Sequence, residues 1–157
     1  MIYFLSLGSN IGNREQTLQT ALQRIEQEVG HVDRCSSFFY SEPWGFESKN
    51  AFCNLCCRVE TELTPLEVLR QTQAIERALG RTHKSVDGHY ADRTIDIDLI
   101  RVFDNEGKEI KCTIHNSQFK MHNASTSSTP LLILPHPLWK EREFVRIPLA
   151  EVLEDPE

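Results

Sequence analysis

The chain has 157 residues, a usual length for one domain, and a core can bury about two thirds of the unfolded surface without disulfides or a structural metal. With 17 Lys and Arg against 23 Asp and Glu, the net charge is −6, which argues against a nucleic-acid-binding or membrane-surface protein. The apolar run at the N-terminus, about six residues, is too short for a signal peptide, so we expect a cytoplasmic protein with reduced cysteines.

The first half of the chain alternates predicted strand and helix. A short apolar run predicts a buried strand over residues 2–7. A capping pattern at Asn13 begins an amphipathic helix, and Gly30 ends it. Two further strands are expected over residues 35–41 and 51–61, separated by a turn-rich loop with two aromatic residues.

The second predicted helix has the clearest boundary signals. Thr64 is a good N-cap, Glu67 completes a capping box, and Gly80 ends the helix. Gln73 and Glu76 lie three residues apart on the flank of its apolar stripe. We therefore expect both side chains at the border between core and solvent.

The rest of the chain is less regular. Residues 81–93 read as a cationic loop, and residues 94–103 as a strand. The polar residues 104–130 predict a long surface loop, residues 131–134 are a short apolar run, and residues 144–153 predict a short terminal strand or helical turn.

The order β-α-β-β-α-β is typical of a ferredoxin-like α+β fold. We expect an antiparallel sheet with helices on one face and further elements on the other, giving αβα layers. The whole chain, residues 1–157, is expected to form a single domain with a longer surface insertion at about 104–130.

Two aspartates in the stretch RTIDIDLI carry the first functional hypothesis. Asp96 and Asp98 share one face of the predicted strand, with Cα atoms about 6.6 Å apart. They are either exposed acids on an outer face or ligands of a hard cation such as Mg²⁺. The cationic loop just before them, together with the absence of a Walker A sequence, favours a metal and triphosphate site built from side chains.

Cys53, Cys56 and Cys57 allow a second reading of metal or redox chemistry. They lie in an apolar stretch, and no Cys/His pair follows at finger-like spacing. We interpret them as buried small hydrophobic residues rather than as a zinc site.

Several segments, in one order along most of the chain, resemble the 6-hydroxymethyl-7,8-dihydropterin pyrophosphokinase family. The matching segments are LGSNIGNRE, FFYSEPWG, FCNLCCRVET, QAIERALGR, RTIDIDLI and LPHPLWKEREFVRIPL. The resemblance implies a monomer that transfers diphosphate from ATP to the pterin hydroxymethyl group in folate biosynthesis, with two Mg²⁺ ions. In line with the net charge, we expect no nucleic-acid or membrane partner.

The resemblance also implies roles for individual residues. Asp96 and Asp98 correspond to the metal ligands, and Arg81 and Arg93 to the residues that stabilise the transferring group. The implied ATP-site residues are Gln73, Glu76, Lys84, His136 and Arg142. The implied pterin-site residues are Pro43, Gly45, Phe52, Asn54, Tyr90 and Phe144, of which Phe52 and Phe144 sandwich the ring and Tyr90 closes over the substrates.

Some positions depart from the family pattern. Asp92 stands where the family usually has a small residue or proline, and His83 where arginine is common. Three other readings stay open at this point: a ferredoxin-like RNA-binding module, another two-metal phosphotransferase or nuclease, and a non-catalytic relative that binds pterin or nucleotide.

Overall fold

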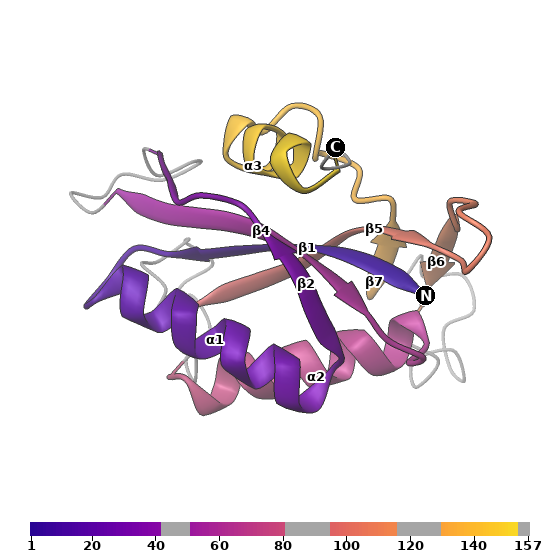
Figure 1. Ribbon diagram of the computed structural model, residues 1–157, viewed down its shortest axis with the longest axis horizontal. Coiled ribbons are helices and arrows are strands. Elements are labelled where there is room, and N and C mark those ends of the chain that lie inside the picture. Colours follow the sequence, from indigo (N-terminus) through magenta and orange to yellow (C-terminus); the bar gives the residue numbers. More distant parts are fainter. Residues whose placement is uncertain (42–50, 81–94, 116–129, 154–157) are drawn as a thin grey trace, which may run out of the picture.

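The frame of the molecule is an antiparallel sheet between layers of helices (Figure 1). The computed structural model describes residues 1–41, 51–80, 95–115 and 130–153. Its strands are β1 Ile2–Ser9, β2 His31–Cys35, β3 Phe39–Ser41, β4 Phe52–Glu60, β5 Asp96–Phe103, β6 Cys112–Ile114 and β7 Leu132–Leu134. Its helices are α1 Arg14–Glu28, α2 Pro65–Ala78 and α3 Glu143–Leu153.

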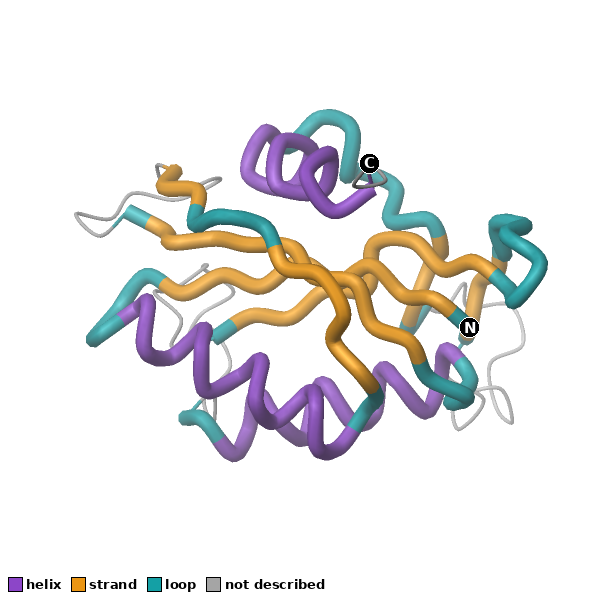
Figure 2. The backbone as a smooth tube through the Cα atoms, in the orientation of Figure 1, coloured by secondary structure: helices purple, strands orange, loops and turns teal. Residues whose placement is uncertain are grey.

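The strand order of the main sheet is β2-β4-β1-β5, and β3 pairs with the start of β4. Every pairing is antiparallel. Helices α1 and α2 cover one face and α3 covers the other (Figures 1 and 2). Strands β6 and β7 form a separate two-stranded sheet.

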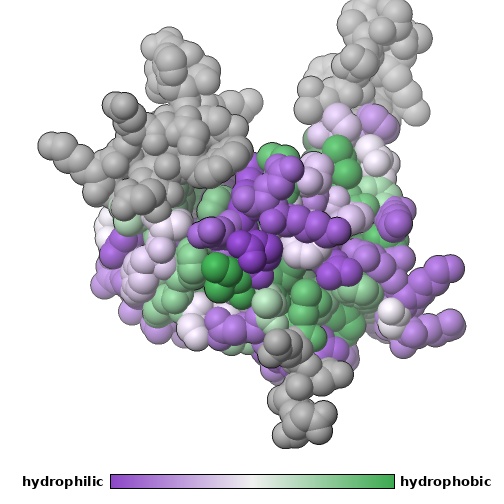
Figure 3. Space-filling model, turned by 90° about the horizontal axis from the view of Figure 1, so that it is seen from above, coloured by the Kyte–Doolittle hydropathy of each residue, from purple (hydrophilic) through white to green (hydrophobic). Residues whose placement is uncertain are grey.

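Alternation along the strands divides the core between the two faces. Tyr3, Leu5 and Leu7 of β1 are fully buried in the cluster that faces α1 and α2. The residues between them point to the α3 face, where a smaller cluster consists of Phe4, Cys56, Ile100, Val145, Leu149 and Val152. On the side of the molecule that carries α3, hydrophobic residues gather beside a band of hydrophilic ones (Figure 3). Helix α3 therefore covers only part of this face of the sheet.

Both long helices begin at the predicted caps. The Asn13 side chain accepts a hydrogen bond from the Gln16 N–H at 3.1 Å. At α2 the Thr64 hydroxyl accepts from the Glu67 N–H, and the Glu67 carboxylate accepts from the Thr64 N–H, so the predicted capping box is confirmed. These bonds satisfy N–H groups that have no partner within a helix.

The outer edge of β5 is occupied by three other segments. The Ile97 N–H donates to the Glu76 carboxylate, and the Ile110 N–H donates to the Val102 carbonyl. The His136 N–H donates to the Ile100 carbonyl at 2.8 Å. The strand that carries the two aspartates is therefore fixed on both sides, by β1 and by these three contacts.

Three predicted elements were wrong in detail. The strand expected over residues 35–41 is two strands, because the Ser36 N–H and hydroxyl bond to the backbone of Cys56 and turn the chain between β2 and β3. The loop expected over residues 104–130 contains β6, which pairs with β7. The terminal segment is an eleven-residue helix, α3, despite Pro148 in its interior.

All five cysteines are free thiols, and Cys53, Cys56 and Cys57 are buried as predicted. Burial raises the pKa of Cys56 to about 12 and that of Cys57 well above its usual value. Within the described residues, no group of three or more His, Cys, Asp or Glu side chains is placed to hold a metal. No helix in the described part of the chain is long and apolar enough to cross a lipid bilayer.

Candidate active site

Three strand ends lie side by side at one end of the sheet, and some of their side chains point to the face that α3 covers. The end of β1 and the starts of β4 and β5 lie there, beside the start of α1 (Figures 1 and 2). Asp96, Gly8 and Asn54 are direct partners across β5, β1 and β4. Directly paired residues of antiparallel strands share a face. This row therefore places a carboxylate and an amide on one surface with only a glycine between them.

The two aspartates alternate with buried residues, as predicted for this strand. Ile97 and Leu99 are buried toward α1 and α2, and Asp96 and Asp98 are half-buried on the opposite face. Their cross-strand neighbours on β1 are small, Gly8 for Asp96 and Ser6 for Asp98. Two carboxylates on one face of a strand suit Mg²⁺, which prefers hard oxygen ligands and retains several waters.

Glu76 fixes the backbone between the two aspartates. Its Oε2 accepts a hydrogen bond from the Ile97 N–H at 2.7 Å, and the residue is 7% exposed. The prediction that Glu76 lies at the border with solvent was therefore wrong, whereas Gln73 is exposed on α2. A charge-assisted hydrogen bond is stronger than a neutral one, so this contact ties α2 to the start of β5.

His136 lies near this end of β5 and is half-buried. Its Nδ1 accepts a hydrogen bond from the Leu138 N–H at 3.1 Å, which assigns the proton of the neutral ring to Nε2. Burial and the charge of Arg142 lower the pKa of His136, against a smaller opposing effect of Asp96. The ring is therefore neutral at pH 7 and can donate one hydrogen bond from Nε2.

Asn54 is the most constrained polar residue of the row. It is 3% exposed, and its Nδ2 donates to the Phe39 carbonyl at 3.1 Å and to the Ser41 hydroxyl at 2.8 Å. Both amide protons are used, so the orientation of the amide is set by its hydrogen bonds. None of the described residues donates to Oδ1, which leaves this oxygen able to accept from a substrate N–H.

Gly8 is a site residue that the sequence did not reveal. A Cβ atom at this position would lie 2.8 Å from the Asn54 Oδ1 and 3.5 Å from the Phe52 Cδ1. The amide and the edge of the aromatic ring therefore lie directly over the backbone of β1. A glycine inside a strand marks such close approaches, a signal that could have identified it.

The start of α3 supplies an aromatic ring and a cation. Phe144 is half-buried against the cluster that contains Phe4, Cys56 and Ile100. The Arg142 guanidinium lies 5.7 Å from the centre of the Phe144 ring. Phe52 is on the same sheet face as Asn54, two residues away on β4, so both aromatic residues predicted for the site lie on the α3 side.

Comparisons with known proteins decide the family. The model of the 7,8-dihydro-6-hydroxymethylpterin-pyrophosphokinase family matches residues 4–154. The chain belongs to this family. It is 42% identical to the 2-amino-4-hydroxy-6-hydroxymethyldihydropteridine pyrophosphokinase of Porphyromonas gingivalis over 151 residues, 96% of this chain and 90% of the relative. The Bacillus subtilis protein of the same name is 35% identical over 157 residues, 99% and 80% of the two chains.

A solved structure supports the fold of this family member. It is described as a crystal structure of HPPK-DHPS in complex with substrates, with a TM-score of 0.62 and 18% sequence identity. The match covers 97% of this chain and 40% of that one, so the present chain spans less than half of the solved protein's length.

For this pyrophosphokinase-family chain, part of the predicted site lies outside the described residues. The implied phosphate contacts Arg81, Lys84 and Arg93 are among these, and so are the implied pterin contacts Pro43, Gly45 and Tyr90. The described part brings Asp96, Asp98, Glu76, His136 and Arg142 to one end of β5 and its neighbours. It brings Phe52 and Asn54 to the adjoining end of β4.

Proposed function

We propose that this protein transfers diphosphate from ATP to the hydroxymethyl group of 6-hydroxymethyl-7,8-dihydropterin and releases AMP, a step of folate biosynthesis. Family membership over nearly the whole chain supports the reaction. The observation that carries the site is the row Asp96–Gly8–Asn54 across three strands. Two inter-strand spacings separate the Cα atoms of Asp96 and Asn54 by about 10 Å, and the Asn54 Oδ1 lies over Gly8 between them.

The two ends of this row are proposed to bind different substrates, the pterin at Asn54 and the metal-bound ATP phosphates at Asp96. Asn54 Oδ1 accepts from an N–H at the polar edge of the pterin, and Phe52 and Phe144 pack on its faces. On the other side of Gly8, Asp96 and Asp98 would hold Mg²⁺ ions, two in the arrangement that the family implies. When bound, the metal offsets the negative charge of the ATP phosphates.

The remaining residues position the triphosphate. Arg142, with Arg81, Lys84 and Arg93, is proposed to neutralise phosphate charge, and His136 to donate from Nε2 in the ATP site with Gln73. The pterin hydroxyl oxygen attacks the β-phosphorus and releases its proton to solvent. The bond from that phosphorus to the oxygen bridging it to the α-phosphorus breaks, and this oxygen leaves on AMP with the bond's electron pair. Most of the rate acceleration in such a reaction comes from positioning the substrates and stabilising charge. Glu76 contributes by holding the Ile97 backbone between the two aspartates.

The architecture is also proposed in finer detail. The strand order β2-β4-β1-β5, with α1 and α2 on one face, supports a ferredoxin-like frame in which β3 is a short addition and α3 a second helical layer. We further propose one domain over residues 1–157, with residues 104–130 as an insertion around β6, and a cytoplasmic monomer. Size-exclusion chromatography with light scattering tests the oligomeric state.

Release of AMP from ATP and Mg²⁺, measured with and without 6-hydroxymethyl-7,8-dihydropterin, tests the reaction. We expect AMP only when the pterin is present. Pterin-independent ATP cleavage would favour a different two-metal phosphotransferase, and pterin binding without AMP would favour a non-catalytic relative. Mg²⁺ is omitted in a matched reaction, where turnover is expected to be lost.

A further inference from the structure

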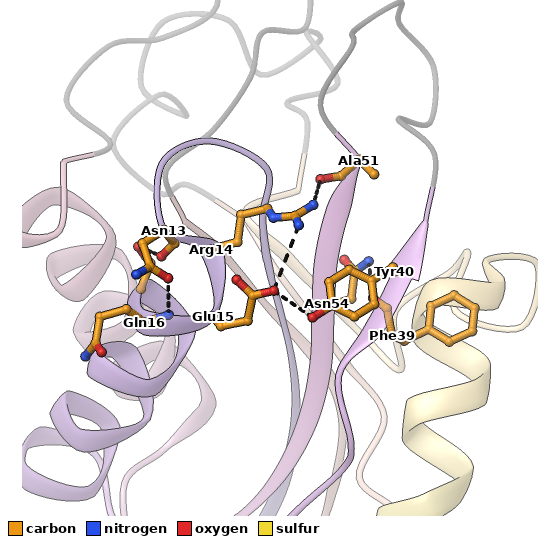
Figure 4. A network of polar contacts seen from close by, with 9 residues as sticks. Asn13, Arg14, Glu15, Gln16, Phe39, Tyr40, Ala51 and Asn54 are labelled. Atoms are coloured by element: carbon orange, nitrogen blue, oxygen red, sulfur yellow. Dashed lines mark hydrogen bonds and ion pairs between the residues drawn. The ribbon is translucent and has the colours of Figure 1, made fainter.

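A polar network joins the start of α1 to β3 and to the start of β4, close to Asn54 (Figure 4). The Tyr40 hydroxyl of β3 donates to the Glu15 carboxylate of α1 at 2.6 Å. Arg14 donates from Nη1 to the Ala51 carbonyl at 2.8 Å, just before β4. The Arg14 guanidinium also lies 5.3 Å from the centre of the Tyr40 ring. Two adjacent residues of α1 thus hold both β3 and the start of β4.

Strand alternation connects this network to Asn54. Tyr40 pairs with Cys53 and points to the helix face, toward α1. Its neighbours in the three-residue strand, Phe39 and Ser41, supply the two acceptors for the Asn54 amide on the opposite face. The hydrogen bonds that orient the Asn54 amide therefore come from the residues immediately before and after Tyr40.

The Tyr40–Glu15 hydrogen bond is important for β3 because few other contacts in the described part of the chain hold this short strand in place. The strand is three residues long, and among the described residues it pairs only with β4. A strand of this length contributes few backbone hydrogen bonds, so a side-chain bond from its central residue is a large share of what fixes it. The Glu15 hydrogen bond is also the main cause that raises the pKa of Tyr40 to about 12, so the hydroxyl remains a donor throughout the physiological range.

We infer that Arg14, Glu15 and Tyr40 are positioning residues for the pterin: they hold β3 and the start of β4 so that Asn54 keeps its Nδ2 toward the protein and its Oδ1 toward the substrate. This inference rests on the proposed function for the identity of the ligand. Among the described residues the network adjoins Asn54 and Phe52, both assigned to the pterin, and so we expect it to act on recognition of the pterin and not on ATP.

Steady-state kinetics with each substrate varied tests the inference. Tyr40→Phe removes only the hydroxyl, and we expect the KM for the pterin to rise about three- to tenfold, with kcat and the KM for ATP changed less than twofold. Glu15→Ala removes the same hydrogen bond and also the 3.9 Å ion pair with Arg14, so we expect a rise at least as large. The double variant is expected to be no worse than Glu15→Ala, because the Tyr40–Glu15 contact is already lost. Glu15→Gln keeps an acceptor oxygen and is expected to restore at least half of the loss.

Glu28→Ala is the matched control, because Glu28 is another carboxylate of α1 that pairs with a side chain, here Arg24, at the far end of the helix. A pterin KM for Tyr40→Phe equal to that of Glu28→Ala would overturn the inference. A wild-type protein without pterin-dependent AMP release would instead refute the proposed function.

A measurement without substrate tests the positioning role independently of the proposed function. The side-chain amide signals of Asn54, assigned by their loss in Asn54→Asp, are expected to shift and to exchange faster with water in Tyr40→Phe than in Glu28→Ala. Unchanged Asn54 signals in Tyr40→Phe would refute the positioning role whatever the ligand is.

Discussion

Gly8→Ala offers a sharp test of the site geometry. The added Cβ would lie 2.8 Å from the Asn54 Oδ1, about 0.6 Å short of an ordinary contact of 3.4 Å. The amide has to move, and its bonds to the Phe39 carbonyl and the Ser41 hydroxyl lengthen from 3.1 and 2.8 Å. Loss of one or both bonds costs about 1–3 kcal/mol.

That free energy is expected to affect both stability and recognition. At about 2–4 °C per kcal/mol for a domain of this size, the melting temperature falls by about 2–12 °C. If the full cost also weakens pterin binding, the KM for the pterin rises by about 5- to 150-fold, while the KM for ATP changes little. Thermal unfolding and kinetics with each substrate varied measure both effects.

Gly12→Ala is the matched control. Gly12 has a φ of 68°, and a Cβ there would meet nothing within 4 Å. An alanine in this left-handed conformation costs about 1–2 kcal/mol of strain without touching Asn54. We therefore expect a lower melting temperature with an unchanged KM for the pterin. If Gly8→Ala kept a normal pterin KM and a normal melting temperature, the reasoning about Asn54 would be refuted.

Three further predictions concern β5 and the buried thiols. Asp98→Asn is expected to lower AMP release by more than about 100-fold with little change in melting temperature, whereas normal turnover would exclude Asp98 as a metal ligand. Glu76→Leu leaves the Ile97 N–H without its acceptor and is expected to cost about 1–3 kcal/mol in urea unfolding, and no loss would contradict the contact. Burial raises the pKa of both Cys56 and Cys57, so the unfolded chain loses these protons first as the pH rises. The free energy of unfolding should therefore fall between about pH 9 and 11, by up to about 1.4 kcal/mol per pH unit for each thiol, and Cys56→Ala should flatten the profile.

The features that depend on local sequence were predicted well. The capping box at Thr64 and Glu67 involves residues three apart, and both hydrogen bonds are present. The alternation of Asp96 and Asp98 with buried residues also depends only on the strand period. These signals need no knowledge of what the segment packs against.

The features set by distant contacts were not predicted. Glu76 is buried because an edge strand needs an acceptor for the Ile97 N–H, a requirement that arises only when α2 and β5 meet. The break between β2 and β3 depends on hydrogen bonds from Ser36 to β4. Pro148 argues against a helix on local grounds, yet its side chain is buried in α3, where tertiary packing outweighs the lost hydrogen bond.

The contacts along the outer edge of β5 have a consequence for self-association. An open edge strand offers a row of backbone groups to which a strand of another molecule can add, which is a common start of aggregation. On β5 the Ile97 N–H and the carbonyls of Ile100 and Val102 are already bonded within the chain. A strand from a second molecule would have to displace Glu76 and the His136 backbone before it could pair there. The contacts that place the strand carrying Asp96 and Asp98 thus also protect it from intermolecular strand addition.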